Sequence, residues 1–410
     1  MLLNRRSMIA SGFVLAAGCA SKPTLAQTSG EPLVETAQGR VRGVVQPNGV
    51  TAFKGMRYAA AAAGPLRFMP PTPPPTWAGV QDAFQFGDQS PQARGRLADS
   101  RVPMSDDCLR INVWTPGLDN ARRPVMLWFH GGGFEAGVGS QPLYDGTRVA
   151  RRGDVVVATI NHRLNVFGHC YLGGVLGDEF QQSGNVGYLD LIASMKWVRE
   201  NIAGFGGDPN NVMIYGQSGG GRKVSLCYAG KDAQGLFHKG VVQSGSHLKV
   251  QTPERANGLT ESLLKELGIA KADARKLQTI DVETLSAAQR KVIGAAGARF
   301  SPMLDGKTFT AHPFLPNAPA ISSHLPMMLG TNRTELTNQM GGEPGIFDMN
   351  ETQAKERLKA FIDEKDIEEA FRIFQASRPQ ANPSEVFFTI ASARGYCRDQ
   401  TIMAEQRVKA

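Results

Sequence analysis

Short runs of apolar residues recur along the central part of the chain, and each has the length of a β-strand. Two of them, PVMLWF at 124–129 and DVVVATIN at 154–161, are almost continuously apolar, which is typical of strands buried on both faces of a parallel sheet. The turn signal Pro47-Asn48-Gly49 separates two shorter runs. The pattern predicts strands at 41–45, 50–53, 109–114, 124–129, 154–161, 212–215, 237–244 and 326–331.

Helical periodicity is found between and after these runs. Residues 189–205 repeat apolar positions at helical spacing, and 252–292 are charged with a helical pattern. One or two amphipathic helices are predicted at 351–376, with a buried side formed by Leu358, Phe361, Ile367, Phe371 and Phe374. The alternation predicts an α/β fold, in which helices flank a mostly parallel central sheet and 252–292 form a helical insertion.

Two segments lack a strand or helix pattern. Repeated prolines in 59–79 exclude a helix or a central strand, so an extended surface loop is expected there. Residues 27–40 are polar, and we expect them to be irregular.

The composition indicates a globular protein. The 410 residues are 41% hydrophobic and 20% charged, which is ordinary for a globular protein. The net charge of +8 comes from scattered basic residues. This distribution indicates a solvated surface, so no nucleic-acid partner is expected.

The first 26 residues have the pattern of an export signal. Arg5 and Arg6 precede an apolar run from Met8 to Ala17, which is too short to span a membrane. Two endings are open: cleavage after Ala26, or a lipid anchor at Cys19. We therefore expect an exported chain, periplasmic or secreted, with residues 1–26 as the signal peptide and 27–410 as one folded domain.

The cysteines limit the choice of cofactor. Cleavage after Ala26 would leave four of the five, and an exported protein could pair them in disulfides that the sequence does not identify. Their spacing is not that of a metal site, and no cofactor or metal is implied.

Residues 216–220 carry the first candidate for chemistry. Gly216-Gln217-Ser218-Gly219-Gly220 follows the predicted strand at 212–215 and matches G-x-S-x-G. In this pattern a strand turns sharply into a helix and exposes the serine hydroxyl at the turn. Because the pattern is short, a plain glycine-rich turn is the alternative.

A glycine run follows another predicted strand. His130-Gly131-Gly132-Gly133-Phe134 comes directly after 124–129, and glycines leave backbone N–H groups unobstructed. Such groups stabilise a developing oxyanion in acyl transfer. A flexible loop is the alternative, but the serine motif downstream favours an oxyanion hole.

These motifs lie within longer stretches that resemble the type-B carboxylesterase and cholinesterase-like family of α/β hydrolases. The similarity covers about 31–340 and is most specific in 184–221 (GNVGYLDLIASMKWVRENIAGFGGDPNNVMIYGQSGGG). The resemblance implies an α/β-hydrolase fold and a small-molecule ester as substrate. It implies Ser218 as nucleophile, Gly132, Gly133 and Gly219 as oxyanion donors, and Glu335, in GTNRTE, as the acid that orients a histidine.

The chain departs from the family pattern at several positions. Gln217 replaces the usual glutamate, Gly219 replaces alanine, and Ser90 stands where relatives have a cysteine that pairs with the equivalent of Cys108. Cys108 is therefore expected to be a buried free thiol. The family's catalytic histidine follows the acid, whereas all seven histidines here precede Glu335.

Two hypotheses follow. The first is a serine carboxylesterase that forms an acyl-enzyme on Ser218, in a chain whose C-terminal part is missing. The alternative is a catalytically inactive cholinesterase-like binding domain or a non-functional truncated product. Retention of Ser218, the glycine run and Glu335 favours the first.

Overall fold

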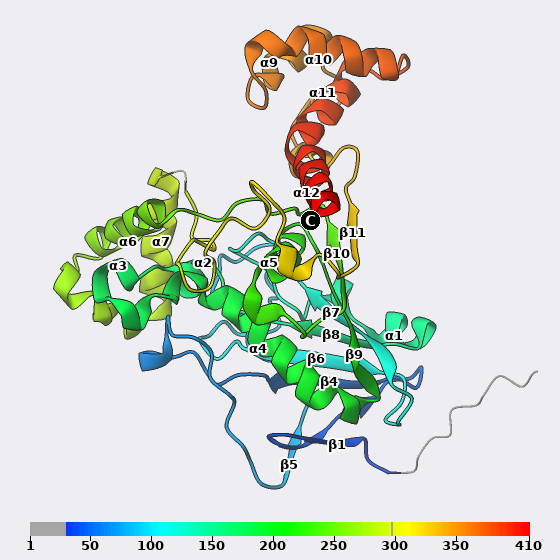
Figure 1. The fold of residues 1–410 in the computed structure, drawn as a ribbon, viewed down its shortest axis with the longest axis vertical. Coiled ribbons are helices and arrows are strands. Elements are labelled where there is room, and N and C mark those ends of the chain that lie inside the picture. The colour runs from blue at the N-terminus through cyan, green and yellow to red at the C-terminus, as the bar shows by residue number, and fades with distance from the viewer. Residues whose placement is uncertain (1–29, 297) are drawn as a thin grey trace, which may run out of the picture. The chain divides into compact units, whose positions relative to one another are not determined.

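The computed structural model describes residues 30–296 and 298–410. Within it, Glu31–Ala410 form one compact unit. The predicted signal peptide at 1–26, with the two alternative endings at Cys19 and Ala26, lies outside the described residues and stays a prediction. Figure 1 shows the described chain as a ribbon.

An eight-stranded sheet forms the centre of the fold, in the order β11-β10-β9-β7-β8-β6-β4-β3. Five neighbouring strands pair in parallel: β11, β10, β9, β7 and β8. The remaining strands, β6, β4 and β3, join the sheet in antiparallel fashion. Seven of the eight predicted strands are present as single strands, whereas the predicted strand 41–45 is broken at Gly43 into the end of β2 (Gly39–Arg42), which belongs to a second sheet, and β3. The bounds in the central sheet are β3 Val44–Val45, β4 Thr51–Arg57, β6 Arg110–Thr115, β7 Arg123–Phe129, β8 Val156–Ile160, β9 Gly207–Gln217, β10 Lys239–Gln243 and β11 Met327–Gly330.

A second, three-stranded sheet corrects the prediction for 27–40. β1 (Leu33–Thr36) and β2 (Gly39–Arg42) form an antiparallel hairpin, and β5 (Val80–Asp82) adds to β2 in parallel. Only Val34 and Thr36 of β1 are buried. Two buried positions separated by polar residues are too weak a signal to mark a strand against its polar surroundings.

Helices surround the central sheet (Figure 1). The predicted helix at 189–205 is α4 followed by a 3₁₀ turn, and the insertion at 252–292 contains α6 and α7. The bounds are α1 Thr147–Gly153, α2 Asn165–His169, α3 Gly173–Leu176, α4 Val186–Asn201, α5 Gly219–Ala229, α6 Pro253–Glu266, α7 Val282–Ala296, α8 Thr337–Met340, α9 Glu351–Leu358, α10 Glu364–Ser377, α11 Pro383–Ser392 and α12 Arg398–Lys409.

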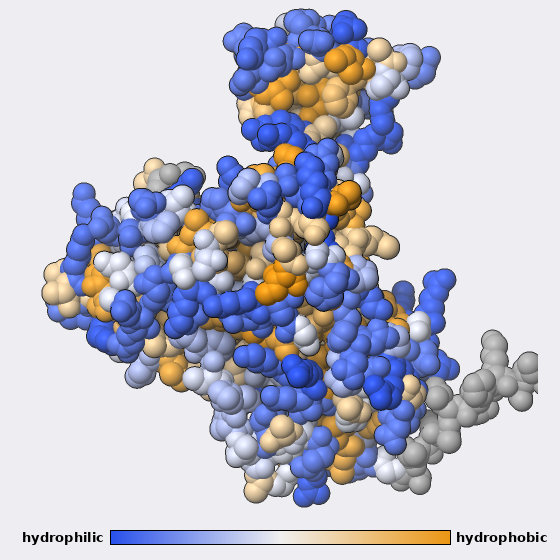
Figure 2. All heavy atoms as spheres, viewed as in Figure 1, coloured by the Kyte–Doolittle hydropathy of each residue, from blue (hydrophilic) through white to orange (hydrophobic). Residues whose placement is uncertain are grey.

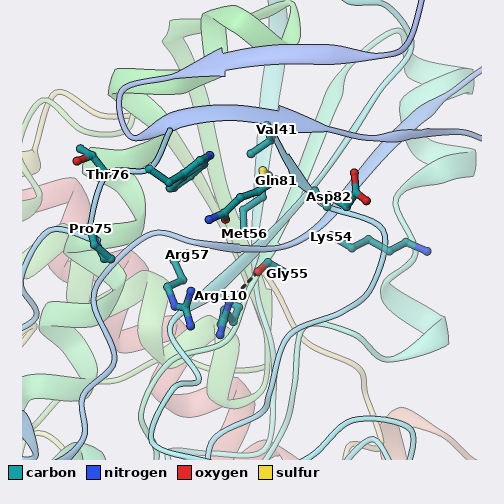
Figure 3. Close-up of a pocket in the computed structure, with 12 residues that line it drawn as sticks. Val41, Lys54, Gly55, Met56, Arg57, Pro75, Thr76, Gln81, Asp82 and Arg110 are labelled. Carbon is teal, nitrogen blue, oxygen red and sulfur yellow. Dashed lines mark hydrogen bonds between the residues drawn. The ribbon is translucent and has the colours of Figure 1, made fainter. Parts of the chain in front are cut away.

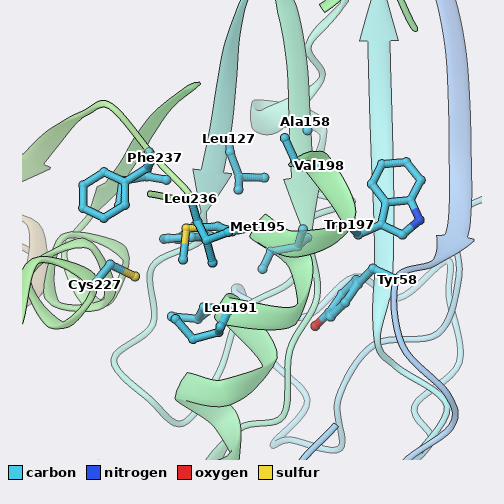
Figure 4. Close-up of a cluster of buried hydrophobic side chains, with 14 of the residues drawn as sticks. Tyr58, Leu127, Ala158, Leu191, Met195, Trp197, Val198, Cys227, Leu236 and Phe237 are labelled. Atoms are coloured by element: carbon cyan, nitrogen blue, oxygen red, sulfur yellow. The ribbon is translucent and has the colours of Figure 1, made fainter. Parts of the chain in front are cut away.

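The main core lies between the sheet and α4. Leu191, Met195 and Val198 project from α4 towards Leu127 of β7 and Ala158 of β8, and Figure 4 shows these side chains meeting. All five are buried. Burying a large aliphatic side chain stabilises a fold by about 1.5–3 kcal/mol, so this layer fixes the strand ends where the serine motif lies.

Of the smaller apolar clusters outside this core, the two largest are built mainly from helices. One joins α2 to α6 and α7, as expected for a helical insertion. The other joins α9, α10 and α11, and it buries Leu358, Ile367 and Phe371, as predicted. The helices α11 and α12 extend the helical part well beyond the predicted limit of residue 376.

The visible surface is largely hydrophilic, with apolar residues in scattered groups (Figure 2). The edge strand β11 carries one such residue, because Met328 is 67% exposed. Over the described ranges, no helix combines the length and the apolar character needed to cross a membrane.

Candidate active site

Ser218 occupies the sharp turn between β9 and α5. Its backbone dihedral angles, φ 56° and ψ −120°, are unusual for a residue other than glycine, and such strain costs about 1–3 kcal/mol. Two hydrogen bonds hold the turn: the Ser218 N–H donates to the Gln243 carbonyl at 2.8 Å, and the Arg222 N–H donates to the Ser218 carbonyl at 3.1 Å. The side chain is partly accessible.

The glycine run after β7 lies against this turn. Gly132 and Gly133 have φ of +92° and +65°, which side chains rarely permit. A methyl group on Gly219 would lie 2.3 Å from the Gly133 backbone nitrogen, so the two backbones are in direct contact. The three glycines named as oxyanion donors, Gly132, Gly133 and Gly219, are thus gathered around the turn that carries Ser218.

Glu335 is connected to the same turn through the end of β10. Its side chain is 9% exposed, and its Oε1 accepts hydrogen bonds from the Ser244 hydroxyl at 2.5 Å and the Asn332 N–H at 2.7 Å. Ser244 follows Gln243, whose carbonyl holds the Ser218 N–H. Ser244 was not singled out from the sequence, although it is the last residue of the strand predicted at 237–244 and directly follows β10, at a strand end where functional residues gather.

Four histidines lie near the glycine run but do not bond to Ser218 or Glu335. His130 and His162 stack with their ring centroids 4.8 Å apart, and Phe134 contacts His169 and His247 edge-on. In the described part of the chain, the Nε2 atoms of all four histidines lack a hydrogen-bond partner.

Burial makes these histidines weak bases. It lowers the pKa of His130 and His162 well below the usual value, and that of His169 and His247 to about 3. A general base works best with a pKa near the operating pH, so none of the four is suited to accept a proton at pH 7. His162 is 1% exposed and is thus a core histidine.

Lys223 is a second residue of the site that the sequence motifs did not indicate. It lies on α5 and is 1% exposed, and its Nζ donates to the His130 carbonyl at 2.8 Å. Burial lowers its pKa to about 7, with a smaller contribution from Arg222. A lysine five residues after the serine has no motif of its own, so only the structure reveals its contact with the glycine run.

The cysteines and the acidic residues form no metal centre in the described ranges, where no group of three potential ligands is placed to bind an ion. Cys108, Cys170, Cys227 and Cys397 are free thiols. The expectation of a buried free thiol at Cys108 is therefore confirmed.

A cavity of 160 Å³ lies elsewhere in the molecule (Figure 3). Its lining comes from β4, β5 and their neighbours, and Arg110 donates to the Gly55 carbonyl at 3.1 Å on one side of it. None of its lining residues belongs to the serine turn, the glycine run or the loop of Glu335. The cavity is therefore separate from the candidate active site.

Comparisons with known proteins agree with this geometry. A model of the carboxylesterase family matches residues 30–395. The para-nitrobenzyl esterase of Bacillus subtilis (strain 168) is 39% identical over 311 residues, which are 74% of this chain and 63% of the relative. The phenmedipham hydrolase of Pseudarthrobacter oxydans is 32% identical over 345 residues, 80% of this chain and 66% of the relative. The chain thus spans somewhat less than two thirds of these curated relatives.

Solved structures share the fold. The carboxylesterase EST55 of Geobacillus stearothermophilus superposes with a TM-score of 0.80 at 36% identity, covering 92% of this chain and 77% of that one. An esterase from Clostridium hathewayi gives a TM-score of 0.78 at 34% identity, covering 93% and 77%.

Proposed function

This chain belongs to the carboxylesterase family, and on that premise we propose that it hydrolyses carboxylic esters through an acyl-enzyme on Ser218. One observation carries the proposal: Ser218 stands at a strained strand-to-helix turn in contact with the backbone of the glycine run. A serine placed in this way has an accessible nucleophile and nearby N–H donors, which acyl transfer needs together.

In the first step, Ser218 Oγ attacks the ester carbonyl carbon and the carbonyl π electrons move to its oxygen. The N–H groups of Gly132, Gly133 and Gly219 donate hydrogen bonds to that oxyanion. Its collapse breaks the bond between the carbonyl carbon and the alkoxy oxygen and leaves the acyl group on Ser218, and the alkoxy oxygen departs as the alcohol with the proton that Ser218 Oγ released. Water then attacks the acyl-enzyme by the same route and releases the acid.

The proton of Ser218 needs an acceptor. The family resemblance assigns this role to a histidine oriented by Glu335, whereas all seven histidines in this sequence precede Glu335. Glu335 is placed for an orienting role, because it is buried and fixed by Ser244 and Asn332. The alternative is a catalytically inactive cholinesterase-like binding domain or a non-functional truncated product.

We propose small esters as substrates. Para-nitrobenzyl esterase and phenmedipham hydrolase are the names of two relatives, and the candidate site offers neutral backbone donors for an ester carbonyl. The scattered positive charge gives no basis for a nucleic-acid partner. Export, with or without a lipid anchor at Cys19, stays a proposal from residues 1–26.

The test is hydrolysis of p-nitrophenyl butyrate by the wild-type chain and by Ser218→Ala. We expect release of nitrophenolate from the wild type and a loss of at least a thousandfold in the variant. Equal rates in the two proteins, with equal melting temperatures, would support the non-catalytic alternative.

A further inference from the structure

A buried cation lies beneath the glycine run, and both of its partners belong to that run. Lys223 Nζ donates to the carbonyl of His130, where the run begins, and lies 6.0 Å from the ring centre of Phe134, where the run ends. A single side chain therefore contacts both ends of the segment that contains Gly132 and Gly133.

The surroundings of Lys223 offer it no opposite charge. Within the described ranges no carboxylate acts on the Lys223 ammonium group, and the nearby titratable groups are Arg222, His130, His162 and His169. Burying a charge without a counter-ion is costly. An apolar residue would fill the same space at lower cost, so stability alone does not explain a lysine here.

The glycine run has little freedom to move towards the serine turn. The Gly133 backbone already contacts Gly219 so closely that a Cβ at Gly219 would collide with it. On the opposite side, the Gln92 side chain bonds to the N–H and carbonyl of Gly137 at 2.7 and 2.9 Å. Gln92 thus fixes the chain just after the run, and Lys223 fixes its beginning.

Resting on the proposed function, we propose that Lys223 is a positioning residue for ester hydrolysis, which holds the glycine run against the serine turn by its hydrogen bond to the His130 carbonyl. The donors of Gly132 and Gly133 then keep their place when the oxyanion forms. Without the bond, the run relaxes away from Ser218, and the loss falls on the transition state more than on substrate binding.

The test compares wild type with Lys223→Met, which keeps the length and volume but has no donor, and with Lys223→Gln, which keeps a neutral donor. Each is assayed for kcat and KM on p-nitrophenyl butyrate, and its melting temperature is measured. For Lys223→Met we expect kcat to fall about tenfold to a hundredfold, with KM within about twofold. Its melting temperature should be equal or higher, because a buried charge has been removed. Lys223→Gln should recover part of kcat.

A purely structural lysine predicts a different result, in which melting temperature and activity fall together and Lys223→Gln gives no recovery. That result, or equal kcat in wild type and Lys223→Met, would overturn the inference. If Lys223→Met does not fold, Lys223→Ala replaces it, and failure of both to fold would also reject the role. Wild-type activity no greater than that of Ser218→Ala would instead reject the proposed function.

Discussion

Glu335 accepts hydrogen bonds from two donors in separate loops, Ser244 and Asn332. The energetic coupling between Glu335 and Ser244 can be measured. Removing the hydroxyl in Ser244→Ala leaves a buried carboxylate with one hydrogen bond fewer, so we expect a loss of about 1–3 kcal/mol in the free energy of unfolding. Glu335→Gln should cost a similar amount. Because the two side chains bond directly, the double variant should lose less free energy of unfolding, measured in urea, than the two single variants lose together. Additive costs would mean that the two residues do not interact in solution.

The buried histidines make stability depend on pH. Burial lowers the pKa of His169 from its ordinary value of 6.5 to about 3, so below pH 6.5 the unfolded chain takes up a proton that the folded chain does not. The free energy of unfolding should therefore fall as pH drops from 6.5 towards 3. Between pH 6.5 and 5 this one group contributes about 2 kcal/mol.

The variant His169→Gln isolates this contribution. Urea unfolding at pH 7 and pH 5 should show a smaller difference between the two pH values than in wild type. The matched control is His324→Gln, because His324 is exposed. An unchanged pH difference in His169→Gln would show that His169 already titrates freely in the fold.

At the scale of elements, successive side chains of the edge strand β11 point alternately to the solvent and to the core. Met328 is exposed, whereas Leu329 packs against the main core. Met328→Lys should change stability by less than about 0.5 kcal/mol and reduce self-association, because a charge on an edge strand opposes pairing with another chain. Leu329→Lys should cost about 1–3 kcal/mol. Light scattering and thermal melts check both, and equal effects would contradict the assigned register of β11.

The elements differ in how well their sequences indicate them. Strand β8 is buried throughout and β7 is buried over most of its length, so both are largely apolar and were predicted close to their bounds. Strand β1 and the first residues of β2 lie in the segment that was expected to be irregular, because pairing between the two strands, not burial, defines them. Helix α11 was also missed, although Asn382, Pro383 and Glu385 form a capping box with proline at its start. That signal was available in the sequence.

The residues of the candidate site also differ in how well the sequence indicates them. Ser218 and the glycine run stand directly after predicted strands, so local sequence was enough to bring them to one sheet edge. Ser244 and Lys223 act through contacts with residues 91 and 93 positions away. Such long-range contacts leave no periodicity or motif, and they emerge only from the folded chain.

At the scale of the whole molecule, the three largest apolar clusters stabilise different parts of the fold. The core around α4 supports the strand ends that bear Ser218 and Glu335, while the clusters of α6 and α7 and of α9 to α11 lie outside it. The family match extends from residue 30 to residue 395 and so includes all three. The residues proposed as nucleophile, oxyanion donors and acid all lie in the compact unit Glu31–Ala410.

Covalent capture of the acyl group tests the central proposal most directly. The chain is mixed with p-nitrophenyl acetate, quenched in acid within milliseconds to seconds, digested, and analysed by mass spectrometry. We predict one acetyl group on the peptide that contains Ser218, and none on the same peptide of Ser218→Ala. An unmodified Ser218 peptide at every quench time, or acetylation that persists to the same extent elsewhere in Ser218→Ala, would contradict an acyl-enzyme at this serine.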